Sequence, residues 1–328
     1  MKRQAARRRP APKQPAPKAT APRPQRRLAG WTAAAVAGIT LLGWAALSRQ
    51  AGTASGVNGE AALEHVRQMV AFGPRPSGST AHETMQRYIV EQAEAAGWTV
   101  EQDRFTASTP NGPIPMNNII ARSPGSDSDA RVIILGAHYD TKLFHEFRFV
   151  GANDGASGSG LLLALAPVLA QQNLQHAVWL AWLDGEEAIR EWTDTDSLYG
   201  SRHMAARLQA EGAVPNITAF LLVDMIGDRD LGIRRETSST PWLTDLVWGV
   251  ARRLGHQRHF LNSMHTISDD HLPFLAVGIP SVVLIDFDYG GISSYWHTAA
   301  DTLDKVSAES LRVVGEVLLE VVAELDQR

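Results

Sequence analysis

The sequence predicts an α/β protein with a largely parallel central sheet covered by helices on both faces. Apolar, β-rich runs that end in polar or acidic residues occur at 131–140, 176–185, 216–228 and 280–287. Helical patterns separate these runs, and continuous apolar strands that alternate with helices indicate a sheet buried on both sides. We find no internal repeat and no second boundary, so residues 60–328 are expected to form one domain.

The remaining elements of this domain follow from shorter patterns. Residues 60–72 and 80–97 have helical periodicity, and the second pattern ends at Gly97, as helices often do. Two strand patterns come next, at 98–105 and 116–122. Later helices are expected at 158–172, 199–212, 241–255 and 307–326.

The N-terminal segment differs in composition from the rest of the chain. Residues 1–27 hold ten Lys or Arg, six Pro and no acidic residue, which leaves a net charge of −14 for the other residues of a chain whose total is −4. Such a segment cannot bury enough apolar surface to order itself, so we interpret it as a disordered basic cytoplasmic tail. We expect no nucleic-acid partner, because the apolar span that follows gives these charges a topological role.

Residues 28–48 carry no charge and are long enough to cross a bilayer as one transmembrane helix. The basic residues before this span place the N-terminus in the cytoplasm and the rest of the chain outside it, in a bacterial periplasm or an equivalent compartment. A cleaved signal peptide is the alternative, although the span is long for one and no clean cleavage site follows. Small residues at 49–59 are expected to link this anchor to the domain.

Polar residues gather where the predicted strands end. His138 and Asp140 close one strand, Asp184 to Glu187 follow the next, and Asp224 ends a third. Ligands of open α/β sheets bind outside the carboxyl ends of the strands, so these side chains predict a site there. The chain has no cysteine, so any metal in this site must be held by nitrogen and oxygen atoms.

Further candidates lie in three loops: Asp154 in "GANDGASGSG", Asp269 in "SDDHLPF" and His297 in "YWHTAADT". Two carboxylates and an imidazole are ligands that zinc takes when no thiolate is present, with a fourth position open for substrate. Each residue alone is more often structural, as a strand-end cap, an Asx turn or an ordinary loop histidine. Their combination in one chain favours a catalytic metal site.

The ordered set His138, Asp154, Glu186–Glu187, Asp224 and His297 resembles the pattern of the zinc aminopeptidase clan, whose fold is the three-layer phosphorylase/hydrolase-like α/β fold. Within that clan, the chain resembles the glutaminyl-peptide cyclotransferases, or glutaminyl cyclases. Three stretches separate these enzymes from their peptidase relatives. They are the insert "AIREWTDTDS" after the glutamate pair, the doubled aspartate in "SDDHLPFLAVGIP", and "YWHTAADTLD", which places a tryptophan before the histidine.

The resemblance implies a role for each matching residue. Zinc, one ion per chain, would be held by Asp154, Glu187 and His297. Glu186 would be the general acid and base, assisted by Asp224 and Asp269. His138 would support the site or hold a second metal. Four apolar residues would contact the substrate: Trp192, Trp296, Ile267 and Ile292.

The implied reaction converts the N-terminal glutamine of peptides or proteins to pyroglutamate with release of ammonia. The expected partners are such peptides and the membrane, and the catalytic domain is expected to be monomeric. A two-zinc aminopeptidase is the main alternative, and an inactive binding ectodomain is a second. The chain departs from the animal cyclases in lacking a cysteine pair, in Gly155 where a serine is usual, and in Ser268 where those enzymes have glutamine.

Overall fold

The computed structural model describes residues 56–125 and 130–328. The predicted tail and the apolar span at 28–48 lie outside the described residues. In the part of the chain that is described, no helix has both the length and the apolar character needed to cross a bilayer.

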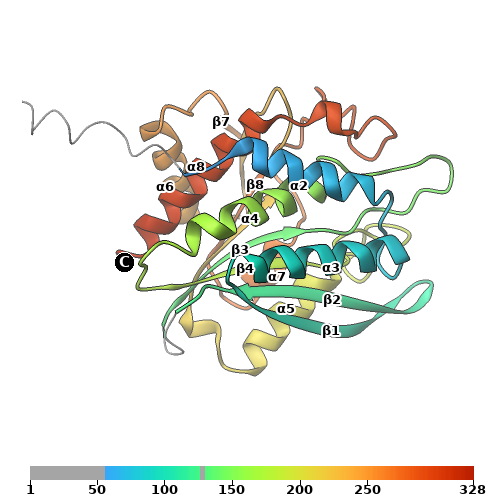
Figure 1. The fold of residues 1–328 in the computed structure, drawn as a ribbon, viewed down its shortest axis with the longest axis horizontal. Coiled ribbons are helices and arrows are strands. Elements are labelled where there is room, and N and C mark those ends of the chain that lie inside the picture. The colour runs from blue at the N-terminus through green and yellow to red at the C-terminus, as the bar shows by residue number, and fades with distance from the viewer. Residues whose placement is uncertain (1–55, 126–129) are drawn as a thin grey trace, which may run out of the picture. The chain divides into compact units, whose positions relative to one another are not determined.

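A six-stranded mixed sheet lies at the centre of the domain (Figure 1). Its strands β4, β3, β5 and β8 are parallel, whereas β2 runs antiparallel to β4 and β1 antiparallel to β2. The prediction of a largely parallel sheet therefore holds for these four strands and not for the β1–β2 hairpin. In spatial order the strands are β1 (Thr99–Thr109), β2 (Gly112–Arg122), β4 (Ala177–Leu183), β3 (Val132–His138), β5 (Ile217–Asp224) and β8 (Ser281–Ile285).

Helices cover both faces of the sheet, as predicted. The helices α2, α3, α4, α6 and α8 pack on one face and α5 and α7 on the other (Figure 1). Alternate residues of β3 enter the two cores: Ile133 and Leu135 on one side, Ile134 on the other. The helices are α2 (Gly59–Ala71), α3 (Thr80–Ala95), α4 (Ala156–Leu169), α5 (Tyr199–Ala210), α6 (Pro241–Arg253), α7 (His271–Ala276) and α8 (Ala308–Leu325).

Side-chain caps define where several helices begin. Asn58 accepts a hydrogen bond from the amide of Ala61 at the start of α2, and Ser79 accepts one from His82 at the start of α3. Val57 is 7% exposed and belongs to the core. Val57 and Asn58 are therefore part of the folded domain, which begins before the residue 60 predicted from the sequence.

Several short elements were not predicted. A two-stranded parallel sheet forms from β6 (Ile233–Glu236) and β7 (Phe260–His265), and α7 has only six residues. One-turn 3₁₀ helices lie at Val214–Asn216 and Leu303–Lys305. Segments this short do not repeat the helix or strand period often enough to be recognised in a sequence.

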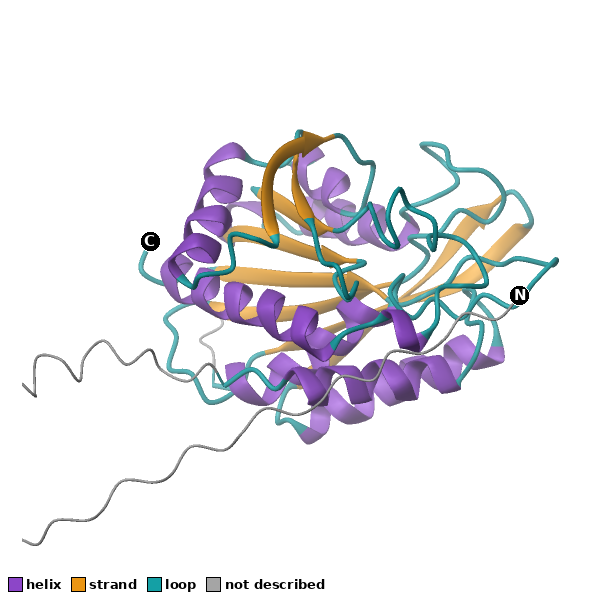
Figure 2. Cartoon of the chain, turned by 90° about the horizontal axis from the view of Figure 1, so that it is seen from above, coloured by secondary structure: helices purple, strands orange, loops and turns teal. Residues whose placement is uncertain are grey.

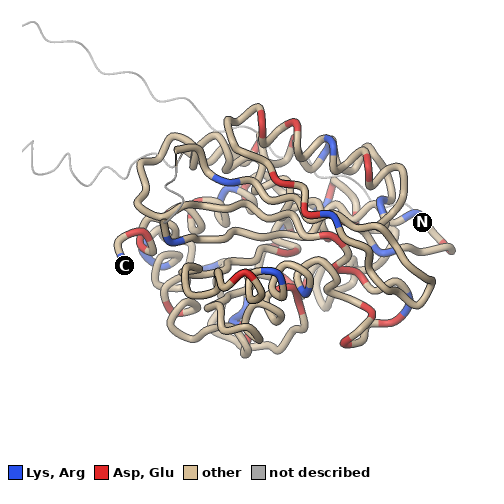
Figure 3. Tube along the Cα trace, turned by 90° about the horizontal axis from the view of Figure 1, so that it is seen from below, with Lys and Arg blue, Asp and Glu red and all other residues tan. Residues whose placement is uncertain are grey.

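Long loops gather beside one end of the central strands (Figure 2). The loops that follow β3, β4, β5 and β8 carry most of the predicted site residues. Lys and Arg positions are interspersed with Asp and Glu positions along the described chain (Figure 3). The concentration of carboxylates in the site is therefore a local feature of these loops.

Candidate active site

Three loops bring the predicted zinc ligands together. Asp154 lies just before α4, Glu187 lies four residues after the end of β4, and His297 lies in the loop that follows β8. His297 Nε2 is 2.9 Å from Glu187 Oε1 and 3.3 Å from Asp154 Oδ2. One ligand atom from each residue lies within 4.8 Å of the others, so the three side chains can share one cation.

The chemistry of these three side chains fits a cation such as zinc. Asp154 Oδ2 and Buried carboxylate oxygens are normally paired, so unpaired ones indicate a group that completes them. Burial disfavours the charged form of His297, but hydrogen bonds to Asp154 and Glu187 raise its pKa to about 10.

A second cluster adjoins the first and shares Asp154. His138 Nε2 lies 3.2 Å from an oxygen of Asp154 and 3.2 Å from one of Asp224. These three residues also offer ligand atoms within 4.8 Å of one another. The structure therefore retains two ligand sets that meet at one carboxylate, as a two-metal hydrolase would require.

Asp140 holds the backbone of the two adjacent glutamates, Glu186 and Glu187. Its carboxylate accepts hydrogen bonds from the backbone amides of Glu186, at 3.2 Å, and Glu187, at 3.3 Å. With the backbone held in this way, Glu187 reaches His297, whereas Glu186 Oε2 lies 4.0 Å from Nδ1 of His138. In the sequence, Asp140 is recognisable as a strand-end residue, but its role as an amide acceptor was not predicted.

Burial raises the pKa of two acids in the site, Glu186 and Asp269. Burial raises the pKa of Glu186 well above its usual range; the positive charge of His138 opposes this, and Glu187 and Asp269 add to it. The pKa of Asp269 is also raised well above its usual range, first by burial and then by the charge of Asp224. Perturbed carboxyl groups of this kind are typical of functional sites.

The candidate metal ligands open into a cavity of about 410 Å³. Trp192, Trp296 and Ile267 line it, together with Phe287. The Trp296 ring stacks on the His297 imidazole, with centroids 4.2 Å apart and planes inclined by 20°. The cavity thus has an acidic end, which contains the candidate metal ligands, and an aromatic wall.

Ile292 lies outside the lining of this cavity. It is 96% exposed, and its contact with substrate stays a prediction. The backbone at Ile292 has φ of 54° and that of Ser293 has φ of 56°. This left-handed turn directs the loop into solvent, a conformation that no local apolar pattern predicts.

Arg75 and Asp301 form a support that the sequence analysis missed. The fully buried Arg75 guanidinium donates to the carbonyl oxygens of Tyr139, Val150 and Gly151, at 3.2, 2.5 and 2.9 Å. Asp301 accepts from the amide of Asp154 at 3.1 Å. Both residues therefore fix the loop that presents the shared ligand. Asp301 lies four residues after the candidate ligand His297, and this closeness in sequence was a signal that could have identified it as part of the site.

A buried ion pair, Glu236 with His271, supports the opposite wall. Glu236 Oε2 lies 3.1 Å from His271 Nε2, and both side chains are fully buried. Glu236 also accepts from the amides of Ser239, at 2.7 Å, and Ile267, at 3.4 Å. The pair thereby joins the end of β6 to the segment that carries Ile267 and Asp269.

Gly155 departs from the residue usual in the cyclases, and the structure explains its glycine. Its φ is +84°, a conformation that side-chain-bearing residues rarely adopt. A Cβ atom at this position would lie 2.6 Å from the carbonyl oxygen of Asp140 and 3.1 Å from Cε1 of His138. In this chain the space that a serine would occupy is taken by the backbone of the β3 loop.

The sequence that forms this site matches a known protein family. Residues 118–322 match the model of peptidase family M28. The chain belongs to peptidase family M28. The region matched includes every residue of both ligand clusters.

Within the M28 family, the chain is similar to glutaminyl cyclases, which confirms the resemblance drawn from its motifs. It is 33% identical to the glutaminyl-peptide cyclotransferase-like protein of Mus musculus, over 76% of this chain and 72% of that protein. It is 31% identical to the glutaminyl-peptide cyclotransferase of Drosophila melanogaster, over 76% of this chain and 78% of that protein.

Solved structures give the same result. The crystal structure of a glutaminyl cyclase from an Acidobacteriales bacterium superposes with a TM-score of 0.78 and 41% identity, over 85% of this chain and 98% of that one. A leucine aminopeptidase precursor from Bacteroides thetaiotaomicron also superposes, with a TM-score of 0.73 and 26% identity, over 81% and 97%. The fold is therefore common to both activities, and the site has to distinguish them.

Proposed function

We propose that this chain is a glutaminyl-peptide cyclotransferase, which closes the N-terminal glutamine of a peptide to pyroglutamate and releases ammonia. The observation that carries the proposal is the position of Glu186. Its carboxyl group lines the cavity beside the cluster of Asp154, Glu187 and His297. Trp192 and Trp296 line the same cavity. The names of the relatives and of the solved glutaminyl cyclase reported above support this activity over the alternatives.

Asp154, Glu187 and His297 would hold the zinc ion, through the oxygen and nitrogen atoms that converge between them. When bound, zinc supplies a Lewis acid that polarises the γ-carbonyl of the glutamine side chain. The deep acidic end of the cavity receives this amide, and the aromatic wall excludes water from it. Trp296 packs on His297, so its indole also keeps the ligand ring in place.

Glu186 performs the proton transfers in this proposal. The α-amine nitrogen of the substrate forms a bond to the carbonyl carbon of the side-chain amide, Cδ, and the bond from that carbon to the amide nitrogen breaks. Glu186 accepts a proton from the attacking amine and returns one to the departing nitrogen, which leaves as ammonia. The raised pKa of its carboxyl group suits a residue that must give the proton back.

The cavity promotes ring closure through proximity. A glutamine side chain folded toward its own amine brings both reacting atoms into one small volume, which lowers the entropic cost of the reaction. Asp269 and Asp224 line the cavity on the side of Glu186 and can accept hydrogen bonds from the amine and the amide. Mass spectrometry of a Gln-initiated peptide tests the proposal, since cyclisation removes about 17 Da whereas a peptidase removes the whole residue.

A two-zinc aminopeptidase is the second candidate, because His138, Asp154 and Asp224 offer a second ligand set. The same mass measurement separates the two activities. An inactive binding ectodomain would change no peptide mass at all. Retention of both the ligand set and the acid beside it favours an enzyme.

We also propose that the domain is membrane-anchored and lies outside the cytoplasm, as a monomer. The support is the charge step across the uncharged span at 28–48. Protease added to cells with a permeabilised outer layer should cleave the catalytic domain while the basic tail stays protected. Protection of the domain would contradict this orientation, and light scattering of the purified domain measures its mass in solution.

A further inference from the structure

A second cavity, of about 270 Å³, adjoins the one that contains the candidate metal ligands. Lys142 and Glu187 line both cavities, so the two spaces meet at these side chains. The first cavity accounts for the N-terminal glutamine in the proposed reaction. The rest of a bound peptide must extend out of the first cavity. The second cavity, beyond Lys142, is the adjoining space.

One cation, Lys142, lies where the cavities meet, and a second, Arg190, lines the first cavity. Lys142 Nζ donates to the carbonyl oxygen of Ala188 at 2.8 Å and lies 4.0 Å from Glu187 Oε2, so some of its N–H groups remain available. Arg190 is exposed and lines the first cavity, and its Nε donates to Asn111 Oδ1 at 2.7 Å. Asn111 itself lines the second cavity and so directs the guanidinium toward it.

The remaining polar groups of the second cavity are mostly satisfied. Asp140 accepts the backbone amides of Glu186 and Glu187, and Ser77 donates to Asp184 at 2.7 Å. The Ser79 hydroxyl oxygen accepts from the amide of His82, which leaves its proton free for a ligand. Glu187 Oε2 also lines this cavity and is unpaired, but the proposed function assigns it to the zinc ion. The other groups left to bind a ligand are donors and the Lys142 cation, which is the chemistry that recognises a carboxylate.

We propose that this second cavity receives the side chain of the residue after the N-terminal glutamine and favours a carboxylate there. The inference rests on the proposed function, and it names the substrate class as peptides that begin Gln-Glu or Gln-Asp. One extended residue spans about 3.3–3.6 Å, so a side chain next to the glutamine can reach Lys142 and Arg190. The two cations supply the selectivity.

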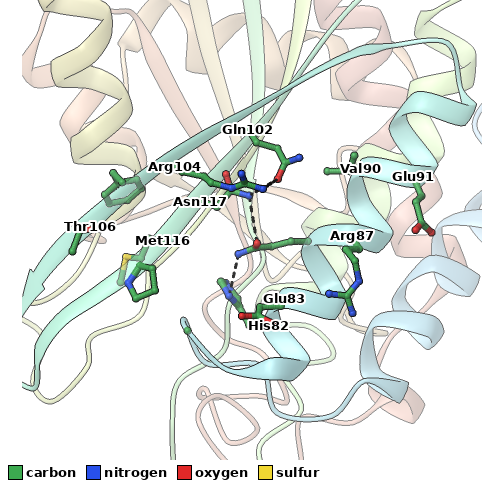
Figure 4. A pocket seen from close by; sticks show the side chains of 14 residues that line it. His82, Glu83, Arg87, Val90, Glu91, Gln102, Arg104, Thr106, Met116 and Asn117 are labelled. Atoms are coloured by element: carbon green, nitrogen blue, oxygen red, sulfur yellow. Dashed lines mark hydrogen bonds between the residues drawn. The ribbon is translucent and has the colours of Figure 1, made fainter.

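A third and larger cavity, of about 660 Å³, lies between α3 and strands β1 and β2 (Figure 4). Its polar side chains already bind one another, because Asn117 donates to Gln86 and Gln102, and Gln86 contacts His82. It shares only Gly78 with the second cavity, beside Ile114. We assign the carboxylate to the second cavity because only that one adjoins the reaction space.

The test compares three peptides that differ only in the second residue: Gln-Glu, Gln-Ala and Gln-Lys. With the zinc-loaded full chain at low salt, kcat/KM from ammonia release should be about 3- to 10-fold higher for Gln-Glu than for Gln-Lys, in line with exposed or partly buried charge pairs. The preference should shrink as salt is added, because exposed charges are screened. Turnover of Gln-Ala is the reference for the proposed reaction itself.

Variants locate the preference. In Arg190→Gln, and more so in the double variant with Lys142→Gln, the ratio of Gln-Glu to Gln-Lys should fall toward one. Arg252→Ala, which removes an exposed cation that lines neither cavity, should keep the wild-type ratio. Because Lys142 is close to Glu187, zinc content is measured for each variant, and the exposed Arg190→Gln variant tests the idea without that complication.

The outcomes are distinguishable. Equal efficiency for all three peptides, a preference for Gln-Lys, or a Gln-Glu preference unchanged in the double variant would overturn the inference and leave the cyclase proposal intact. Failure to convert any of the three peptides would overturn the proposed function, and this inference with it.

Discussion

Glu187 Oε1 lies 2.9 Å from His297 Nε2, although 110 residues separate the two in the chain. Glu187 leaves the end of β4, whereas His297 comes from the loop after β8, at the edge of the sheet. The contact is possible because parallel strands end on the same side of the sheet, and it fixes which of two neighbouring glutamates faces the metal cluster.

Replacing each glutamate by glutamine should separate their roles. Glu186→Gln keeps the shape of the side chain but cannot accept and return a proton, so kcat should fall by about 10²-fold or more while zinc stays bound. Glu187→Gln should instead lose zinc, because a neutral amide is a poorer ligand than a carboxylate. Metal analysis of both variants, followed by kinetics, makes the comparison.

Two outcomes would contradict this assignment. If Glu186→Gln lost zinc and Glu187→Gln retained it, the roles would be reversed. If both variants kept zinc and activity, the glutamates would be no more than buried structural acids, and the site would lie elsewhere.

The purified protein should bind close to one zinc per chain. Chelation should abolish turnover and leave the fold largely intact, because the two apolar cores on the faces of the sheet do not depend on the metal. Circular dichroism before and after chelation checks the fold, and elemental analysis counts the metal. Two tightly held zinc ions would show that His138 and Asp224 also bind metal, and would favour the aminopeptidase.

Arg75→Met should destabilise the domain by about 3–5 kcal/mol. The substitution leaves the carbonyl oxygens of Tyr139, Val150 and Gly151 without their buried donor. Chemical denaturation measures the effect. Arg67→Met is the matched control, because Arg67 is an exposed residue of α2 paired with Glu64, and its loss should change stability by less than about 0.5 kcal/mol. Equal changes in stability in the two variants would contradict the role of Arg75 in holding this loop.

Glu236→Gln should lower stability by about 1–3 kcal/mol and raise KM, because Glu236 holds His271 and the segment that carries Ile267. Zinc content should not change. Glu309→Gln, an exposed acid of α8 paired with Arg312, serves as the control. An unchanged KM in Glu236→Gln would mean that the ion pair does not position the cavity wall.

The same ion pair should make stability depend on acid pH. Burial raises the pKa of Glu236, but the hydrogen bonds from His271 and the amide of Ser238 outweigh it and bring the pKa to about 2, below the usual 4.5. A lowered folded-state pKa means that the unfolded chain takes up the proton first, so this stabilisation is complete above pH 4.5 and is lost as the pH falls toward 2. Unfolding curves for the wild type should converge with those of Glu236→Gln across this range. Parallel curves would contradict the assignment.

The fold class could be predicted from the sequence because it depends on local, repeated signals. Apolar runs such as 131–140 and 216–228 are long enough to show a buried strand, and the acids that follow them mark the carboxyl edge of the sheet. The candidate ligands Asp154, Glu187 and His297 could be proposed from the sequence for a related reason. Their residue types and their order along the chain can be recognised without knowledge of the distances between them.

The tertiary structure decided which side chains support that site, because their partners are distant in sequence and follow no period. Arg75 binds carbonyl oxygens up to 76 residues away, and His271 pairs with a glutamate 35 residues before it. The outward turn at Ile292 depends on backbone conformation, which an apolar residue type does not reveal. Only the packing of these segments brings the donors, acids and cations within a few ångströms, where burial and charge determine what each of them can do.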